Sequence, residues 1–377
     1  MTESIYSDMS APPLRNGLGN RPLKGLLLAG GHGTRLRPLT YTGNKHMLPI
    51  ANKPMLMYGL DQLRGAGIKE IGVVLGPLQE GILEALGDGS KFGIKVTYLD
   101  QPDPKGIAHA VLISRDFLED EPFAVHLGDN LLKDRIPSLV REFETSDADA
   151  TVFVSRVKDP TRFGVVLIKD GKILKLVEKP KQYVSDLALA GLYFFRSSIF
   201  DAMAKLKPSW RNELEITEAI QNLLDSGGKI AYHEITGWWK DTGRPEDILE
   251  ANQLVLSDLK PSIKGKVEEE VAIAGNIEIG EGTIIRKGST LRGPVVIGEK
   301  SEIGPETYIG PYTSVGSKVR IARAEIENSI ILDGTTIDCR ERIVDSIIGK
   351  NSQITSNGNH RPTGRRFVVG ESTFVSL

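Results

Sequence analysis

Hydrophobic and polar positions follow one repeated pattern along the first two thirds of the chain. Short apolar runs typical of buried parallel strands alternate with segments whose apolar residues recur at helical spacing. The run 26–28 precedes a helical pattern over 54–65, and a second run over 71–75 precedes a helical pattern over 79–86. This alternation predicts an α/β domain with a Rossmann-like, mostly parallel sheet covered on both faces, whose ligand crevice lies at the carboxyl ends of the strands.

Further elements continue this domain. Apolar patterns predict strands over 95–99, 123–127 and 190–195, and a hairpin over 162–180 that turns at Gly171.

The acidic segment 211–218 is expected to open an amphipathic helix. Its carboxylates suit the positive N-terminal end of a helix. We therefore interpret Glu215 and Glu218 as helix-capping residues.

A different pattern begins at residue 271, where helix-forming residues become rare and glycine recurs. An aliphatic residue then stands at every sixth position: Ile273, Ile279, Ile285, Leu291, Ile297, Ile303, Ile309, Val315 and Ile321. A period of six fits neither strand alternation nor a helix, and it predicts a left-handed parallel β-helix that stacks these residues inward. The register slips over 322–328 and resumes at Ile331, which we interpret as an inserted loop or bulge.

This repeat is expected to be structural. Acyltransferases built on such coils need a general base, usually histidine. None of the six histidines lies in the repeats, and His360 follows them in a polar, irregular segment, 357–364. We expect the repeat to support contacts in a homo-oligomer.

The length of 377 residues suggests two or three domains. Residues 1–22 are rich in Ser, Pro, Gly and Asn without apolar periodicity, so we expect a mobile extension. The α/β domain is predicted over 23–260 and the β-helix domain over 265–377.

Composition excludes several classes of partner and compartment. A net charge of −2 gives no broad basic field, so neither nucleic acid nor a membrane is an expected partner. The single cysteine, Cys339, cannot form an internal disulfide, which favours a reducing cytoplasm. Because the chain has no apolar run of about 18 residues and no export-signal pattern, we expect a soluble protein.

A glycine-rich loop follows the first strand, with Gly30, Gly31 and Gly33 inside four positions. Such a turn brings backbone N–H groups close to an anion, and the planar fork of Arg35 can clamp two phosphate oxygens. No Gly-Lys-Ser/Thr follows, which excludes a Walker loop, and the third glycine of the dinucleotide fingerprint is missing.

Asp129 stands directly after the predicted strand 123–127, in Gly-Asp-Asn. An aspartate there is often only a turn former. However, magnesium on nucleotide phosphates is typically held by one or two protein carboxylates. Asp129 is therefore a candidate magnesium ligand, and Asp241, behind Trp238 and Trp239, is a candidate partner.

The order Gly-Gly-x-Gly-Thr-Arg-Leu-x-Pro-Leu-Thr, followed by Lys and Leu-Pro, resembles the signature of the sugar-1-phosphate nucleotidylyltransferases. Phe-Gly-Val-Val over 163–166, Glu-Lys-Pro over 178–180 and Trp-Lys-Asp-Thr-Gly over 239–243 are similar to further motifs of that family. With its appended repeat, the chain most resembles the long-form glucose-1-phosphate thymidylyltransferases. The resemblance implies in-line attack of a sugar 1-phosphate oxygen on the α-phosphorus of dTTP, with pyrophosphate leaving.

The resemblance also implies the site residues. Catalytic roles fall to Arg35, Lys45, Asp129 and Lys179. The nucleotide is held by Leu28, Gly30, Gly31, Gly33, Thr34, Arg35, Gln101, Gly106 and Asp129. The sugar phosphate is held by Gly164, Glu178, Lys179, Gly191 and Tyr193. Magnesium, as Mg2+, is held by Asp129 and Asp241.

Two departures from the family pattern bear on these roles. His46 and His109 stand where the family often has glutamine, so the choice between thymine and uracil stays open and a UTP-using uridylyltransferase is the first alternative. Asn212 replaces the glycine of the family's Gly-Glu-Leu-Glu-Ile-Thr segment.

A non-catalytic sugar-nucleotide sensor is the second alternative. A sensor would tolerate loss of the charged groups Lys45, Asp129 and Asp241, and all three are present.

Overall fold

The computed structural model describes residues 23–134 and 136–356. The predicted mobile extension 1–22, and the predicted irregular segment 357–364 with His360, lie outside the described residues.

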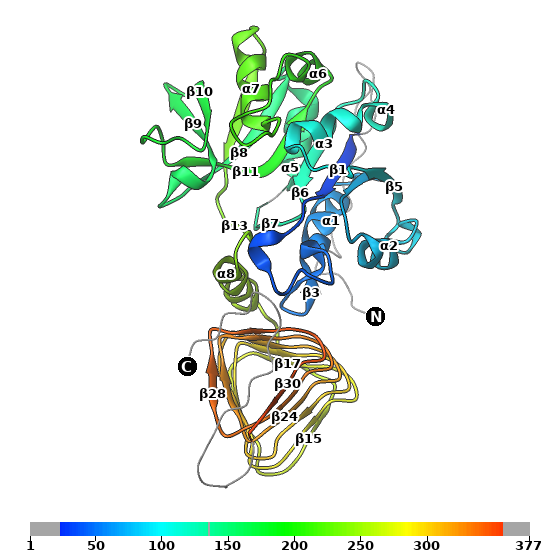
Figure 1. Cartoon of the computed structure of the whole chain (residues 1–377), viewed down its shortest axis with the longest axis vertical. Coiled ribbons are helices and arrows are strands. Elements are labelled where there is room, and N and C mark those ends of the chain that lie inside the picture. Colours follow the sequence, from blue (N-terminus) through cyan, green and yellow to red (C-terminus); the bar gives the residue numbers. More distant parts are fainter. Residues whose placement is uncertain (1–22, 135, 357–377) are drawn as a thin grey trace. The chain divides into compact units, whose positions relative to one another are not determined.

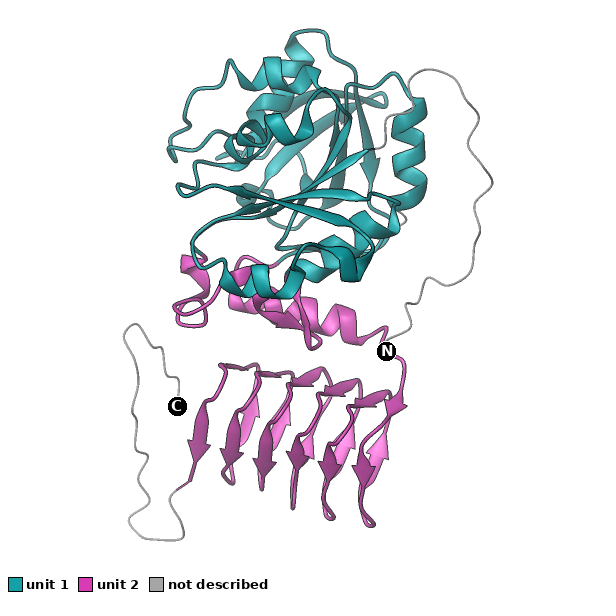
Figure 2. Cartoon of the chain, turned by 90° about the vertical axis from the view of Figure 1, so that its right-hand side faces the viewer, with its two compact units in different colours: residues 1–32, 56–241 teal, residues 33–55, 242–377 magenta. Residues whose placement is uncertain are grey.

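The chain forms two compact units (Figure 2). Unit 1 holds the described residues up to His32 together with 56–241, and unit 2 holds 33–55 together with the residues from Thr242 onward. The domain boundaries at residues 260 and 265 stay a prediction.

Unit 1 is built on a mixed sheet with the strand order β10-β9-β11-β6-β1-β4-β5, and β8 and β12 extend it beside β11. Strands β1, β4, β5 and β6 run parallel, whereas β11 pairs antiparallel with β6 and β9 pairs antiparallel with β10. The strands are β1 (Lys24–Ala29), β4 (Glu70–Leu75), β5 (Lys95–Asp100), β6 (Phe123–Leu127), β8 (Ala150–Arg156), β9 (Gly164–Lys169), β10 (Lys172–Glu178), β11 (Leu187–Phe195) and β12 (Ile230–Glu234).

Helices cover both faces of this sheet (Figure 1). The α-helices of the chain are α1 (Met55–Gly65), α2 (Glu80–Leu86), α3 (Ile107–Ile113), α4 (Arg115–Leu118), α5 (Ile136–Thr145), α6 (Ser198–Met203), α7 (Ile216–Asp225) and α8 (Pro245–Leu256). None of these helices, in the part of the chain that the structure describes, is long and apolar enough to cross a membrane.

The apolar run of β1 is continuous because its two sides face different helices. Leu26 and Leu28 belong to a buried cluster with residues of α3, α6 and α7. On the other side, Leu27 packs against Gly59 of α1. A strand buried on both faces needs apolar residues at every position, and the predicted α/β class with its Rossmann-like sheet is confirmed.

In unit 2, the segment 33–55 contains the 3-10 helices η1 (Thr34–Leu36) and η2 (Lys45–Met47) and the two-stranded hairpin β2 (Pro49–Ile50) and β3 (Lys53–Pro54). The segment clusters with α8 and with the C-terminal repeat rather than with the strand that precedes it.

The repeat folds into three parallel sheets, as predicted for a parallel β-helix. The first sheet holds β14 (Ser262–Ile263), β17 (Ile277–Ile279), β20 (Val295–Ile297), β23 (Thr313–Val315), β26 (Ile330–Ile331) and β29 (Ile347–Ile348). The second holds β15 (Lys266–Val267), β18 (Ile284–Ile285), β21 (Glu302–Ile303), β24 (Arg320–Ala322), β27 (Thr336–Asp338) and β30 (Gln353–Thr355). The third holds β16 (Ala272–Ala274), β19 (Thr290–Arg292), β22 (Tyr308–Ile309), β25 (Glu325–Glu327) and β28 (Arg342–Val344).

Each of the first coils is 18 residues long, which is three hexads. Leu291 pairs with Ile273 of the preceding coil and with Ile309 of the following coil. The hexad residues therefore form columns, and their side chains make one buried core. Hydroxyls lie between the coils: Thr283 Oγ1 donates to the carbonyl of Gly298 at 2.6 Å, and Ser301 Oγ donates to that of Gly316 at 2.9 Å.

The predicted insertion near residues 322–328 is wrong, because the coil there becomes shorter. Ile309 pairs with Ile326 and Val315 pairs with Ile331, which are separations of 17 and 16 residues instead of 18. The shortened corners hold Arg323 at φ 58° and Asn328 at φ 45°, in the left-handed region. The slip removes residues from corners and leaves the inward column intact.

The column in the third sheet offers a matched test of coil packing. Ile309 is fully buried, whereas Ile273, in the same column at the end of the coil, is 39% exposed. We expect Ile309→Ala to lower the free energy of unfolding of unit 2 by about 2–5 kcal/mol, because truncation leaves a cavity. Ile273→Ala should cost about 1 kcal/mol or less. Urea titrations of the full chain measure both, and equal losses would contradict this account of the core.

Candidate active site

The glycine-rich loop and Asp129 leave the sheet at the same edge. Strands β1 and β6 pair in parallel with Leu28 opposite Leu127, and the N–H of Gly128 donates to the carbonyl of Leu28 at 2.8 Å. The turns that follow the two strands, which begin at Gly30 and at Gly128, therefore start side by side. This is the crevice position expected at the carboxyl ends of parallel strands.

Gln101 reaches the same edge from β5. Its N–H donates to the carbonyl of Leu75 at the end of β4, and its buried side chain points toward Gly30. A Cβ on Gly30 would lie 2.9 Å from Gln101 Oε1, and one on Gly76 would lie 3.0 Å from the nitrogen of Gly31. A side chain on Gly76 would press on the backbone of the loop, whereas one on Gly30 would displace the Gln101 amide.

The Gln101 amide has a defined orientation. Its Nε2 donates to His109 Nδ1 at 2.8 Å and lies 3.4 Å from the carbonyl of Gly106, so Oε1 is the atom turned toward Gly30. Burial and the positive charge of Lys105 lower the pKa of His109, against an opposing effect of Asp103. A neutral His109 can accept at Nδ1 and carry its proton on Nε2.

A short ladder brings the backbones of the two predicted metal-binding residues close together. Strand β7 (Asn130–Leu132) pairs antiparallel with β13 (Trp239–Asp241), and Asp241 stands opposite Asn130, the residue after Asp129. Within this ladder Trp239 Nε1 donates to Asn130 Oδ1 at 2.8 Å, and Asn130 Nδ2 donates to Asp129 Oδ1 at 3.0 Å. The tryptophan thereby fixes the amide that orients the carboxylate.

Gly191 connects this ladder to β11. It adopts φ 69°, and a Cβ there would lie 2.7 Å from Asn130 Oδ1. The pairing of β11 with β8 is irregular between Leu189 and Tyr193, which surrounds this position. Only a residue without a side chain leaves room for the buried Asn130 amide.

Glu178 lies at the end of the predicted hairpin, which the structure forms from β9 and β10. Its Oε2 accepts a hydrogen bond from Thr217 Oγ1 at 2.6 Å, and its Oε1 lies 3.7 Å from Lys179 Nζ. A Cβ on Gly164 would collide with Thr217 Oγ1, so the predicted sugar-side glycine is in contact with this group. Lys179 has φ 40°, a left-handed conformation that lysine rarely adopts.

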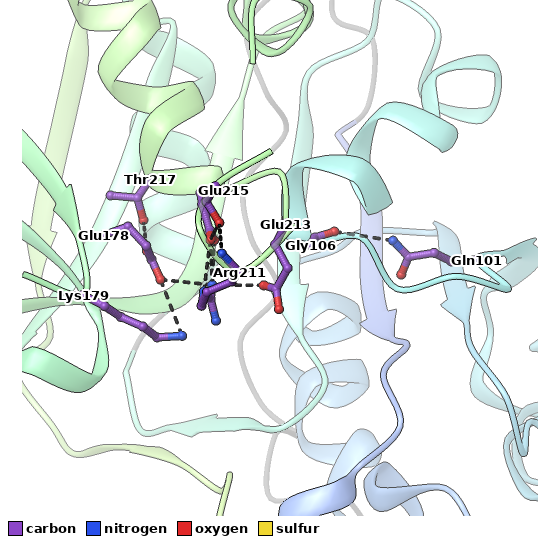
Figure 3. A network of polar contacts seen from close by, with 9 residues as sticks. Gln101, Gly106, Glu178, Lys179, Arg211, Glu213, Glu215 and Thr217 are labelled. Atoms are coloured by element: carbon purple, nitrogen blue, oxygen red, sulfur yellow. Dashed lines mark hydrogen bonds and ion pairs between the residues drawn. The ribbon is translucent and has the colours of Figure 1, made fainter. Parts of the chain in front are cut away.

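Arg211 holds three carboxylates together beside this hairpin (Figure 3). Its guanidinium donates to Glu215 at 2.7 Å, lies 2.9 Å from Glu213, and approaches Glu178 Oε1 at 3.4 Å. Glu215 also accepts from Ser209 Oγ at 2.7 Å. The network fixes the side of Glu178 that faces away from Thr217.

Two expectations about this segment are wrong. Helix α7 begins at Ile216 rather than near Arg211. Glu215 occupies the N-cap position of α7, but its side chain makes no capping bond because Arg211 and Ser209 engage it. Glu218 does lie in the first turn of α7, where burial and the charges of Glu215 and Glu178 raise its pKa.

Asn212, which stands where the family has glycine, adopts a backbone conformation that glycine adopts readily. It adopts φ 60°, and asparagine tolerates this left-handed conformation better than most residues. Its N–H donates to the carbonyl of Ser209 at 2.8 Å, which closes the turn.

Tyr193 is almost fully buried and stacks on Phe195 at 5.7 Å between ring centroids. Burial and, to a smaller extent, the negative charge of Glu178 raise the pKa of its hydroxyl. Tyr193 therefore stays protonated beside the sugar-side network.

The remaining predicted residues lie in unit 2. Thr34 and Arg35 lie in η1, and Arg35 is exposed. The carbonyl of Gly33 accepts from Thr40 Oγ1 at 2.8 Å, and a Cβ on Gly33 would lie 3.2 Å from Cβ of Lys45. The start of η1 and the start of η2 therefore pack against each other.

The donor set at the β7–β13 ladder fits magnesium. Asp129 and Asp241 supply hard carboxylate oxygens, and magnesium is usually bound by one or two carboxylates completed by substrate phosphates. Across 23–134 and 136–356, no group of three or more His, Cys, Asp or Glu side chains forms a metal cluster.

Sequence reasoning missed several polar residues of this site. The partners of Arg211, Thr217 and Trp239 are Glu178 and Asn130, which are remote in sequence. Trp239 and Thr217 do stand in segments similar to family motifs, and Arg211 opens the acidic run 211–215, but nothing local in the sequence shows which residues they contact.

Comparison with known proteins places the chain in a family. The nucleotidyl transferase model matches residues 24–258, and the GMPPB C-terminal domain model matches residues 291–375. These matches span both the α/β domain and most of the repeat.

Individual relatives agree with the family match. The chain is 47% identical over 357 residues to the low-salt glycan biosynthesis nucleotidyltransferase Agl11 of Haloferax volcanii, which covers 94% of this chain and 100% of that protein. It is 45% identical over 357 residues to a glucose-1-phosphate thymidylyltransferase of Streptomyces antibioticus, covering 94% and 99%.

Among solved structures, the chain is similar to a Bacillus anthracis protein provisionally named glucose-1-phosphate thymidylyltransferase and crystallised with sucrose. The TM-score is 0.59 at 38% identity, over 64% of this chain and 98% of that one. The resemblance drawn from the sequence motifs is thus confirmed, and the chain belongs to the nucleotidyl transferase family as a nucleotidyltransferase enzyme.

Proposed function

We propose that this enzyme transfers the nucleotidyl group of dTTP to glucose 1-phosphate, giving dTDP-glucose and pyrophosphate. The observation that carries the proposal is the β7–β13 ladder, which sets Asp241 beside the Asp129 turn at the edge where the glycine-rich loop begins. The names of the relatives from Streptomyces antibioticus and Bacillus anthracis support the sugar phosphate and the nucleotide.

In the proposed reaction an oxygen of the sugar phosphate attacks the α-phosphorus in line. The bond from the α-phosphorus to the bridging oxygen breaks, and pyrophosphate leaves with that oxygen. No covalent enzyme intermediate is required, so positioning and charge neutralisation supply the catalysis.

The nucleotide is assigned to the glycine-rich loop and the segment that follows it in sequence. Gly30, Gly31 and the strand end at Leu28 would hold the phosphates, and Gly33 and Thr34 would extend this loop. Arg35 would neutralise the β- and γ-phosphates, and Lys45 would contact the α-phosphate. The guanidinium of Arg35 can contact two phosphate oxygens at once, whereas the ammonium of Lys45 is a compact charge that suits a single phosphate group.

The base is assigned to Gln101 and Gly106. Because His109 holds Gln101 Nε2, the Oε1 atom is left to accept from the N3–H that thymine and uracil share. This contact favours a pyrimidine and leaves UTP as the alternative.

The sugar phosphate is assigned to the hairpin side of unit 1. Glu178 and Gly164 would meet sugar hydroxyls, Lys179 would contact the phosphate, and Gly191 and Tyr193 would shape the site. The left-handed backbone of Lys179 supports a functional role, since such conformations persist where the surroundings enforce them.

Asp129 and Asp241 would hold Mg2+. When bound, the ion supplies positive charge to phosphate oxygens. The proposal also sets the enzyme in the cytoplasm as a homo-oligomer that acts on small molecules, with neither nucleic acid nor a membrane as partner.

The first test is pyrophosphate release from glucose 1-phosphate with each common nucleoside triphosphate. We expect release with dTTP and a loss of about 100-fold or more in Asp129→Asn, because a charge aimed at the phosphates is removed. Asp201→Asn, on the exposed surface of α6, is the matched control and should keep wild-type activity.

A preference for UTP would move the assignment to a uridylyltransferase. No release with any nucleotide or sugar phosphate would overturn the enzyme's proposed reaction and favour the sugar-nucleotide sensor.

The His109 contact predicts a pH dependence of nucleotide binding. The pKa of His109 is lowered, so the neutral form that accepts from Gln101 is present at neutral pH and is lost as pH falls through this reduced pKa. Protonated Nδ1 becomes a donor and no longer accepts from the amide, so the KM for dTTP should rise by about 2- to 10-fold at acidic pH. His109→Gln, which does not titrate, should show a flatter profile. Identical profiles would remove His109 from this role.

A further inference from the structure

The hairpin in unit 2 turns through a strained backbone. Ile50 pairs with Lys53, so Ala51 and Asn52 form a two-residue loop, with φ 47° and φ 61°. Two successive left-handed residues are typical of a type I′ turn, which usually contains glycine. An alanine in this conformation costs about 1–2 kcal/mol, so neighbouring contacts must enforce the turn.

Asn252 of α8 supplies the first of these contacts. It is fully buried, and its Oδ1 accepts from the N–H of Ala51 at 2.8 Å and from Ser314 Oγ at 2.7 Å. Its Nδ2 donates to the carbonyl of Tyr312 at 2.9 Å. One amide thus joins the turn to strand β23 of the coil.

Asn52 supplies the second contact, because its Nδ2 donates directly to the carbonyl of Val315 at 2.7 Å. Further along the same segment, Leu39 Cδ2 lies 3.9 Å from the position that a Cβ on Gly349 would take. The segment 33–55 therefore contacts the coil at β23 and also approaches it at Gly349, directly after β29.

The held turn is rigidly connected to the charged residues of the segment. The N–H of Met55 donates to the carbonyl of Leu48, and the N–H of Leu48 donates to that of Lys45, which ties the hairpin to η2. Lys45 in turn packs against Gly33, directly before η1 and Arg35.

We propose that the β-helix is part of the catalytic apparatus: through Asn252 and Asn52 it positions the segment that carries Lys45 and Arg35. The inference rests on the proposed function for the roles of these two charges. It makes Asn252 and Asn52 positioning residues and gives the repeat an indirect part in nucleotide binding.

The test uses the full chain with two variants and one control. Asn52→Gly removes only the side-chain bond to Val315 and leaves the left-handed turn free of strain. Asn252→Ala removes the buried amide. Ser301→Ala is the control, since Ser301 is buried like Asn252 and its hydroxyl bonds within the coil, to Glu299, Gly316 and Val319.

Steady-state kinetics with the nucleotide that the wild type accepts should separate positioning from stability. We expect both asparagine variants to raise the nucleotide KM and lower kcat, with a combined loss in kcat/KM of about 10- to 100-fold, and to leave the KM for the sugar phosphate unchanged. Ser301→Ala should change neither KM. A fall in kcat alone, as partial unfolding would give, would overturn the inference.

Amide hydrogen exchange of peptides over 33–48 needs no turnover and therefore tests the inference even if the proposed substrates fail. Both asparagine variants should exchange faster there than the wild type, whereas Ser301→Ala should not. Unchanged exchange in both variants overturns the inference and leaves the proposed function standing.

Discussion

The parallel pairing of β1 with β6 is the constraint on which the rest of the site depends. It sets Leu28 opposite Leu127 and ties Gly128 to β1, so the glycine-rich loop and the Asp129 turn start side by side. Strands β4 and β5 continue the same edge and deliver Gln101 to it. Because paired strands fix these starting points, the polar groups that follow are placed with the precision that phosphate chemistry demands.

The buried Asn130 and the half-buried Arg211 connect segments that are distant in sequence. Asn130 joins Trp239 to Asp129, and Arg211 joins Glu215 to Glu178. Each has several donors or acceptors, so one side chain can satisfy groups from two or three elements. Loss of one partner leaves a buried donor or acceptor unsatisfied, which lowers the stability of the folded site. The site is therefore sensitive to substitutions well away from the reacting atoms.

Local patterns predicted the fold because burial leaves a direct mark on sequence. The two-sided burial of Leu26, Leu27 and Leu28, and the six-residue columns of the coil, are both readable from apolar spacing alone. The spacing also shows that the six-residue register shifts near Arg323, but it does not show why. A shortened corner and an insertion shift the register in the same way, and the insertion that we predicted is wrong. The tertiary partners of Arg211 and Asn252 have no local signature, so neither network was predictable.

The division of the chain into units has a consequence for how such proteins can recombine. The chain leaves unit 1 after His32, returns to it at Leu56 and leaves again after Asp241, so the border between units is crossed three times. A coil exchanged between relatives at one crossover near residue 260 would meet a foreign hairpin at Val315 and a foreign helix α8 at Tyr312. A protein that acquires a new coil would therefore also need matching substitutions in the segment 33–55. We expect the repeat and this segment to evolve together.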